Sequence, residues 1–353
     1  FIPRKCAIFV LIPTPVPTAG IKYTIDALTG DGIIADAAKL GDYFGAFVSN
    51  GPLSYAYLLV FLLFTAFVVL RGIEEGIERI AKVLMPSLFV LMLVLIVRGV
   101  TLPGGWNGVE YLFMPRWEDF NSTALFNAMG FCFFSLSLGA GTMITYGSYL
   151  NPKADLPSSV GWVAFLGILS SILGGLMVMP AVFAFNLDPT AGPGLTFVTM
   201  PAIFAQMPFG QLFAVFFYVC LLVAAITSSV SMMEACVSLL NQELMLSRRN
   251  AIVATTVGAA VVGLGATLSF GAWSDITFFG KNFFDLLDYL TSNVGMPLST
   301  FGIAIAAAWV AWKTTAAELQ TARTLSPGLL KLTRFLIGFF SPIFVLIVAL
   351  GSL

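Results

Sequence analysis

Long apolar runs separated by short polar segments recur along most of the chain. Eight of them are long enough to cross the hydrocarbon core of a bilayer as helices, which takes about 20 apolar residues. No run shows the alternating pattern of a barrel strand, and backbone polar groups in lipid must pair within their own segment, so we expect all eight to be helical. The runs are 53–70, 80–97, 125–150, 160–185, 212–240, 251–268, 283–312 and 332–353.

The third run is interrupted at its middle by Ser135, Ser137, Gly139 and Gly141. Each glycine costs a helix about 1 kcal/mol relative to alanine, and non-helical backbone at membrane depth is tolerated only around a cavity or inside protein. The cluster therefore predicts a local unwinding, of the kind that holds an anionic substrate and Na⁺ with half-helix ends and free carbonyls. The alternative is close packing of two helices through small residues, and this segment alone leaves both open.

The fifth run carries a second polar stripe. At helical spacing Ala224, Thr227, Ser228 and Ser231 share one face, which Glu234 continues. One carbonyl and two hydroxyls suit a hard cation such as Na⁺, although such hydroxyls also bond to their own helix backbone. A carboxylate inside a membrane is costly and functional by default, and for Glu234 we favour support of a polar network over direct contact with an ion.

The first fifty residues follow a different pattern. A short apolar stretch, 7–12, is followed by three prolines at alternate positions: Pro13, Pro15 and Pro17. Because proline lacks an amide donor, we do not expect this segment in a regular helix. Residues 20–30 resemble the outer end of a helix with a glycine stop. We therefore expect residues 1–50 to be irregular, with part of one further helix and an outer loop, and residues 51–353 to form a single transmembrane domain.

Composition supports an integral membrane protein. The chain is 58% hydrophobic and 10% charged, where soluble domains have about 25% charged residues. Apolar runs along the whole length exclude a cleaved targeting segment as their cause, and a net charge of −1 gives no indication of nucleic-acid binding. The cysteines have neither metal-site nor disulfide spacing, so we expect inert buried thiols: Cys6, Cys132, Cys220 and Cys236.

The basic residues predict an orientation. Ten lysines and arginines fall in the loops after the first, third, fifth and seventh runs, against four in the alternate loops. By the positive-inside rule the first set is cytoplasmic and the C-terminus lies outside. We expect a multi-pass protein of the cell (inner, cytoplasmic) membrane.

Two long motifs, FFSLSLGAGTMITYGSYL at 133–150 and AAITSSVSMMEA at 224–235, resemble the neurotransmitter:sodium symporter family in its bacterial amino-acid branch. Three other stretches resemble the loop between the family's fourth and fifth helices, the outer loop before its eighth helix, and its tenth helix: 71–86, 192–210 and 283–297. The similarity runs from about Gly20 to the end of the chain.

This resemblance implies an all-α fold of two inverted five-helix repeats. The eight runs would be the family's helices four to eleven, after a partial third, with the second repeat at about 123–312. It also implies sodium-coupled symport of an amino acid or related small amine by alternating access around a broken sixth helix, and no enzyme activity. Na⁺ is the implied ion, and chloride dependence is left open.

The resemblance further assigns roles to individual residues. The substrate pocket would be lined by Phe134, Ser135, Ser137 and Ala140, with Ser228 and Met232 opposite. Sodium would be held in one site with the help of Ser135, and in a second by the Ala224 carbonyl, Thr227 and Ser228. Asp288 matches the carboxylate that closes the outer gate against an arginine, and Glu234 would support the polar network. The small Ala140 suggests room for a large apolar or aromatic amino acid.

The chain also departs from the family pattern. The first and second helices, which carry half of each sodium site and the gate arginine, have no counterpart, and the sequence begins with Phe1. We therefore expect an N-terminally truncated chain. Phe131 replaces a residue that is usually polar, and 165–167 lacks the family's Asn or carboxylate, which leaves only Ser170 and Ser171 for the first sodium site.

Two other functions stay open on the sequence. The first is an inactive remnant or a partner-dependent membrane subunit. The second is an intramembrane enzyme, because Asp285 and Asp288 share one helix face, but for this pair we favour a solvated gate over a protease dyad.

Overall fold

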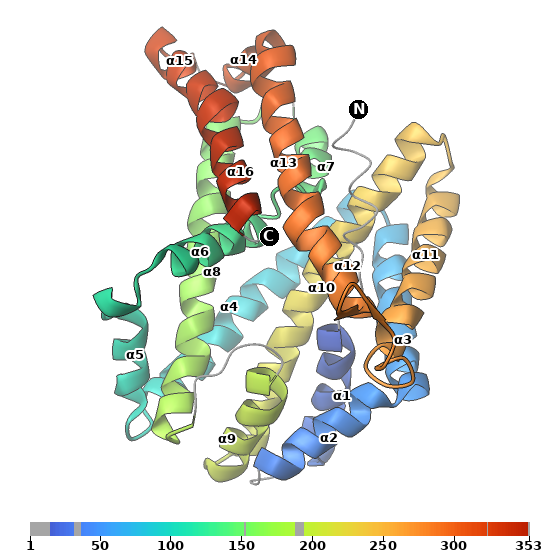
Figure 1. The fold of residues 1–353 in the computed structure, drawn as a ribbon, viewed down its shortest axis with the longest axis vertical. Coiled ribbons are helices and arrows are strands. Elements are labelled where there is room, and N and C mark those ends of the chain that lie inside the picture. The colour runs from blue at the N-terminus through green and yellow to red at the C-terminus, as the bar shows by residue number, and fades with distance from the viewer. Residues whose placement is uncertain (1–14, 32–36, 152, 188–193, 323, 352–353) are drawn as a thin grey trace.

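The computed structural model describes residues 15–31, 37–151, 153–187, 194–322 and 324–351, which are almost entirely helical (Figure 1). Seven of its helices are long and apolar enough to cross a membrane, which confirms the all-α membrane class. Their bounds are Gly51–Leu70 (α3), Glu75–Val100 (the end of η2 and α4), Leu156–Ala184 (α8), Gly210–Glu243 (α10), Arg248–Leu268 (α11), Phe283–Val310 (α12 to η6) and Pro327–Ala349 (α15 to α16).

Shorter elements connect and cover these helices. The α-helices are α1 (Pro15–Thr29), α2 (Ala37–Ser49), α5 (Gly105–Phe113), α6 (Ser122–Ser135), α7 (Thr142–Tyr149), α9 (Met200–Gln206) and α14 (Trp312–Leu319). Within the long helices, α4 is Arg79–Val100, α12 Phe283–Asp288, α13 Met296–Ile305, α15 Pro327–Phe335 and α16 Ser341–Gly351. π-Helical turns are η2 (Ile73–Glu78), η4 (Leu195–Thr199), η5 (Tyr289–Gly295), η6 (Ala306–Val310) and η7 (Leu336–Phe340), and η3 (Trp117–Asp119) is 3₁₀. A small antiparallel ribbon pairs β1 (Thr277–Phe278) with β2 (Lys281–Asn282).

The third apolar run, 125–150, is not a continuous span but two helices joined by an unwound segment. α6 ends at Ser135 and α7 begins at Thr142, and we call residues 136–141 the break. Its backbone is left-handed at Ser137 (φ 52°), Gly139 (φ 84°) and Gly141 (φ 82°). Only glycine adopts this region at no steric cost, and three such residues in five cannot continue a right-handed helix. The predicted interruption of the third run is confirmed.

The expectation for the prolines was wrong. α1 begins at Pro15 and includes Pro17, while Pro13 lies outside the described residues. The first amides of a helix have no intrahelical partner, so proline in the first turn removes no hydrogen bond. The other end of α1 is as expected, because Gly30 follows it with a φ of 88°.

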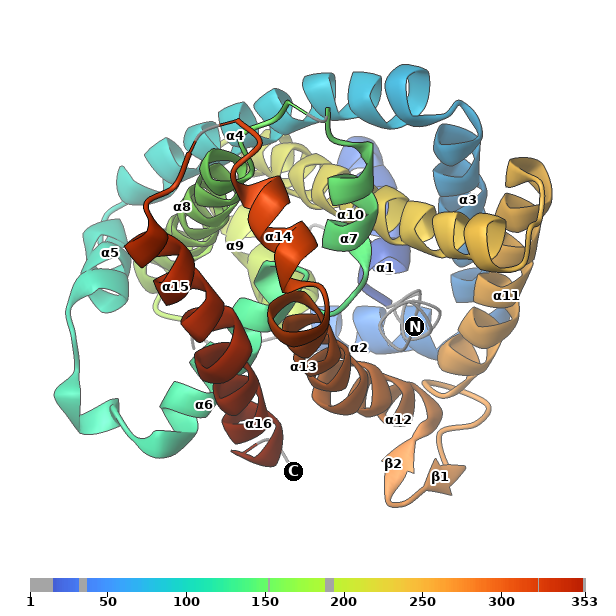
Figure 2. The same ribbon diagram turned by 90° about the horizontal axis from the view of Figure 1, so that it is seen from above.

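α10 lies at the centre of the packing (Figure 2). It packs against α1, α3, α4 and α11, and α13 packs against α16. Among the described residues, a large apolar cluster lies where α1 and α10 meet, and it contains a group of aromatic rings that includes Tyr23, Phe197 and Tyr218. The polar stripe of the fifth run therefore lies on a helix that is held by neighbours on several sides.

The cysteines differ from expectation at one position. Cys220 and Cys236 are buried on α10, as expected, but Cys132 is exposed. It lies on α6, which packs against α16. Cys6 lies outside the described residues.

Candidate functional site

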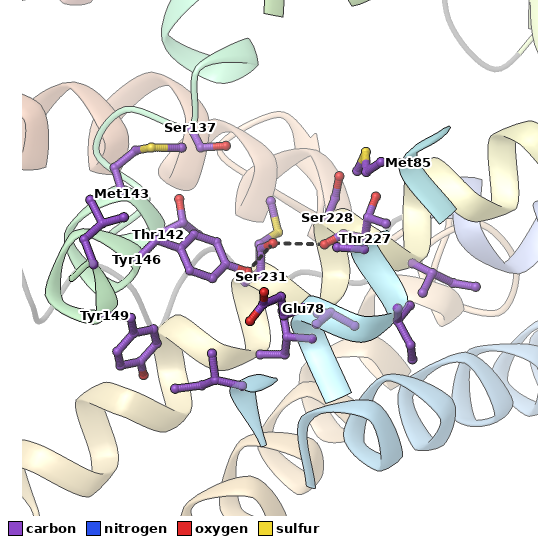
Figure 3. A pocket seen from close by; sticks show the side chains of 18 of the residues that line it. Glu78, Met85, Ser137, Thr142, Met143, Tyr146, Tyr149, Thr227, Ser228 and Ser231 are labelled. Atoms are coloured by element: carbon purple, nitrogen blue, oxygen red, sulfur yellow. Dashed lines mark hydrogen bonds between the residues drawn. The ribbon is translucent and has the colours of Figure 1, made fainter. Parts of the chain in front are cut away.

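A cavity of about 710 Å³ lies beside the break (Figure 3). Three parts of the chain form its wall: the break with α7, the turn η2 with the start of α4, and the middle of α10. The cavity brings together five residues that the sequence assigned to substrate or sodium: Ser135, Ser137, Thr227, Ser228 and Met232. Segments more than 80 positions apart therefore meet at one site.

The other assigned residues lie elsewhere. Ala140 is buried and does not line the cavity. Ala224 is partly buried against an apolar cluster of α4 and α10, and nothing is described of the Phe134 side chain. Asp288 is exposed on α12, where its carboxylate accepts a 3.1 Å hydrogen bond from the Ser292 hydroxyl, and no arginine of the described residues forms an ion pair with it.

The break is held in place by close contact with α13. A Cβ added at Gly139 would lie 2.2 Å from the carbonyl oxygen of Met296 and 2.6 Å from Oγ1 of Thr300. Both distances are far below van der Waals contact, so only glycine lets the backbone approach this closely. The glycine in the motif thus serves both the left-handed turn and the approach to α13.

Thr142, the first residue of α7, is a cavity residue that the sequence analysis did not single out. Its side chain is buried, and its hydroxyl has no hydrogen-bond partner among the described residues. A buried polar group without a partner costs free energy unless a ligand or water satisfies it. Its position directly after the predicted unwinding was the only signal in the sequence.

The α10 stripe is hydrogen-bonded both to its own helix and to α7. The Thr227 hydroxyl donates to the carbonyl oxygens of Ala224 (3.0 Å) and Val223 (3.2 Å), so the backbone bonding weighed as an alternative is present. The hydroxyl oxygen keeps lone pairs for a cation. Ser231 donates to the Thr227 carbonyl (3.0 Å) and accepts from the hydroxyl of Tyr146 on α7 (2.7 Å).

Glu234 lies about one turn after Ser231 on α10, and its side chain is fully buried. Its carboxylate accepts two hydrogen bonds from the Arg248 guanidinium, at 2.9 and 2.7 Å, and one from the Tyr149 hydroxyl at 2.7 Å. Arg248 also donates to the carbonyl of Val69 at the end of α3 (3.1 Å). This network joins α3, α7, α10 and α11, and Glu234 is not a cavity-lining residue.

Comparisons with known proteins agree with this architecture. The profile of the Sodium:neurotransmitter symporter family matches residues 45–353. The uncharacterized sodium-dependent transporter YhdH of Bacillus subtilis is 37% identical over 81% of this chain and 63% of its own length. An uncharacterized sodium-dependent transporter of Haemophilus influenzae is 32% identical over 94% of this chain and 74% of its own.

A solved structure is similar over the full chain. The crystal structure of MhsT in complex with L-phenylalanine superposes with a TM-score of 0.89 at 34% identity, covering 100% of this chain and 80% of MhsT. The chain spans less than two thirds of the B. subtilis relative. Because the family profile covers most of the sequence, the chain belongs to the Sodium:neurotransmitter symporter family, a family of membrane transporters and not of enzymes.

Proposed function

We propose that this chain performs sodium-coupled symport of an amino acid or a related small amine across the inner membrane, by alternating access around the break. The observation that carries the proposal is the cavity in which serines at the break face the hydroxyls of Thr227 and Ser228. A pocket beside an interrupted transmembrane helix is the arrangement by which such transporters bind ions and substrate.

Sodium is assigned to the α10 side of this cavity. Thr227 and Ser228 line the cavity, and the Ala224 carbonyl lies one turn earlier on α10, outside the cavity wall. Together they would supply neutral oxygen ligands, which small hard cations prefer. The Thr227 hydroxyl oxygen lies 3.0 Å from the Ala224 carbonyl oxygen, so the two oxygens are close enough to share one ion. Ser135, at the end of α6, would help to hold sodium at a first site beside the substrate.

The substrate is assigned to the space between the break and α10. The positive end of the α7 dipole and the unpartnered Thr142 hydroxyl suit a carboxylate or another polar group. Met143, Met232 and Ile226 line the same cavity and suit an apolar side chain. Ser137 and Ser228 line the cavity as well. The family resemblance adds Phe134, Asp288 as an outer gate residue and Glu234 in the supporting network, whereas Ala140 lies outside the cavity wall. The L-phenylalanine bound to MhsT makes apolar and aromatic amino acids the first substrates to test.

Uptake by proteoliposomes tests the proposal. The full chain is expected to take up a radiolabelled amino acid from a mixed pool when sodium is outside, and not when choline replaces it. Thr227→Val keeps the side-chain shape but removes a proposed ligand, so it should raise the sodium concentration for half-maximal uptake. Thr333→Val is the matched control, because its hydroxyl bonds to the backbone of α15 away from the cavity.

Equal uptake in sodium and choline would exclude sodium coupling. No uptake of any amino acid, together with no sodium-dependent rise in thermal stability in detergent, would favour an inactive or partner-dependent chain instead. The two results are distinguishable because the stability measurement needs no transport.

A further inference from the structure

We propose that Tyr146 is a positioning residue that couples sodium on α10 to α7, the inner half of the broken helix, through Ser231. The inference rests on the proposed function, since it requires sodium at Thr227 and Ser228. It adds a residue to which neither the sequence motifs nor the family comparison gave a role.

Two hydrogen bonds form the link (Figure 3). The Tyr146 hydroxyl donates to the Ser231 hydroxyl at 2.7 Å, and the Ser231 hydroxyl donates to the Thr227 carbonyl at 3.0 Å. All three residues line the cavity. The link therefore runs from α7 to the backbone of the residue whose hydroxyl is a proposed sodium ligand.

The link fixes the turn of α10 that carries the proposed ligands. A hydroxyl that accepts a hydrogen bond becomes a stronger donor, so Tyr146 strengthens the bond from Ser231 to the Thr227 carbonyl. Serine bonded to the carbonyl four residues earlier also bends a helix locally. The orientation of Thr227 and Ser228 toward the cavity thus depends on where α7 lies.

The dependence is reciprocal. If the observed position of α7 favours sodium on α10, sodium must favour that position of α7 to the same degree. The neighbouring Tyr149 has a different task, because its hydroxyl binds the carboxylate of Glu234, which does not line the cavity. α7 therefore has one tyrosine that anchors it to the charged network and one that connects it to the ion.

Sodium titration of thermal stability tests the link. The purified full chain in detergent is titrated with NaCl, with choline chloride added to constant ionic strength, and the sodium concentration for half-maximal stabilisation is measured. Tyr146→Phe and Ser231→Ala should each raise this concentration about 3- to 10-fold, the worth of one hydrogen bond. The double variant should match the single ones, because both remove the same link. Tyr55→Phe is the control, since it deletes a tyrosine hydroxyl bonded to the Ala260 carbonyl between α3 and α11.

The outcomes separate the two proposals. A wild-type chain that sodium does not stabilise more than choline contradicts the proposed function and the link with it. A sodium-stabilised wild type whose half-maximal concentration is unchanged in both variants contradicts the link alone, even if their melting temperatures fall, because that pattern is purely structural. Additive shifts in the double variant also contradict it. Should Tyr146→Phe fail to fold, Ser231→Ala carries the same test from the other helix.

Discussion

Arg248 and Glu234 form a bidentate ion pair, and the side chains of the two partners differ sharply in solvent exposure. The Glu234 side chain is 0% exposed, whereas that of Arg248 is 37% exposed. Glu234 therefore depends on its protein partners for all its solvation, while Arg248 also reaches solvent. Removal of one partner from a buried pair is costly because the other charge stays behind without compensation.

This asymmetry predicts which substitution does more damage. Arg248→Met strands a buried carboxylate and should lower the free energy of unfolding by about 3–5 kcal/mol. Glu234→Gln leaves a partly solvated guanidinium and should cost less, and the double variant should be more stable than Arg248→Met alone. Thermal unfolding of the purified variants in detergent measures the order. If Glu234→Gln were the more damaging of the two, the pair would not be held as described.

Gly139 is expected to tolerate no side chain. Gly139→Ala forces a Cβ into the left-handed region, which costs about 1–2 kcal/mol, and into the Met296 carbonyl, so melting temperature and uptake should both fall. Gly147→Ala is the matched control on α7, because nothing lies within 4 Å of an added Cβ there. It should be neutral or stabilising by up to about 1 kcal/mol. Equal effects at the two glycines would exclude the close approach of the break to α13.

Ser137 combines a left-handed backbone with a hydroxyl in the cavity. Ser137→Gly removes the backbone strain of the positive φ, because glycine adopts this region freely. Ser137→Val increases that strain, since β-branched residues rarely adopt positive φ. Glycine should therefore give the higher melting temperature, while both variants lose substrate affinity because both lack the hydroxyl. Unchanged affinity in the glycine variant would show that the hydroxyl does not contact substrate.

A charged cluster fixes α2 to α1. Lys22 and Asp26 pair at 2.6 Å with side chains only 12% and 14% exposed, and the Tyr43 hydroxyl donates to the same carboxylate at 3.0 Å. The Lys22 ammonium also lies 4.1 Å from the Tyr43 ring centre.

Two substitutions at Tyr43 should separate these interactions. Tyr43→Phe keeps the ring and should cost about 1.5–3 kcal/mol, the range for hydrogen bonds to charged groups. Tyr43→Leu also loses the cation–ring contact and should cost about 0.5–1 kcal/mol more. Urea or thermal unfolding compares the two, and a phenylalanine variant as stable as the wild type would mean that the hydroxyl bond contributes nothing.

Features that depend on local chemistry could be predicted from the sequence. Two serines and two glycines clustered in an apolar run weaken a helix there. A break at these residues was therefore one of the two structures expected, and it is the one that occurs. The N-cap residue Asn50 and the apolar run after it likewise fix the start of α3, although pattern alone placed that start at residue 53. The π-helical turns, such as η5, were not among the sequence predictions.

Long-range partners could not be predicted. The sequence showed that Glu234 needs a partner, but Arg248 and Arg249 were equally available, and only the fold selects Arg248. The bond from Tyr146 to Ser231 joins residues 85 positions apart and has no local signature. The prediction made from the prolines failed for a different reason. Proline disrupts the interior of a helix, but it removes no hydrogen bond in the first turn, which is where Pro15 and Pro17 lie.

The contact of Gly139 with the Met296 carbonyl has a mechanical consequence. The break is fixed near its middle, where Gly139 touches α13. The left-handed residues on either side, Ser137 and Gly141, interrupt the helical hydrogen bonding there, so α6 and α7 are not joined by a continuous helical backbone. For the proposed alternating access, this gives the two halves of the broken helix a shared fixed point at Gly139.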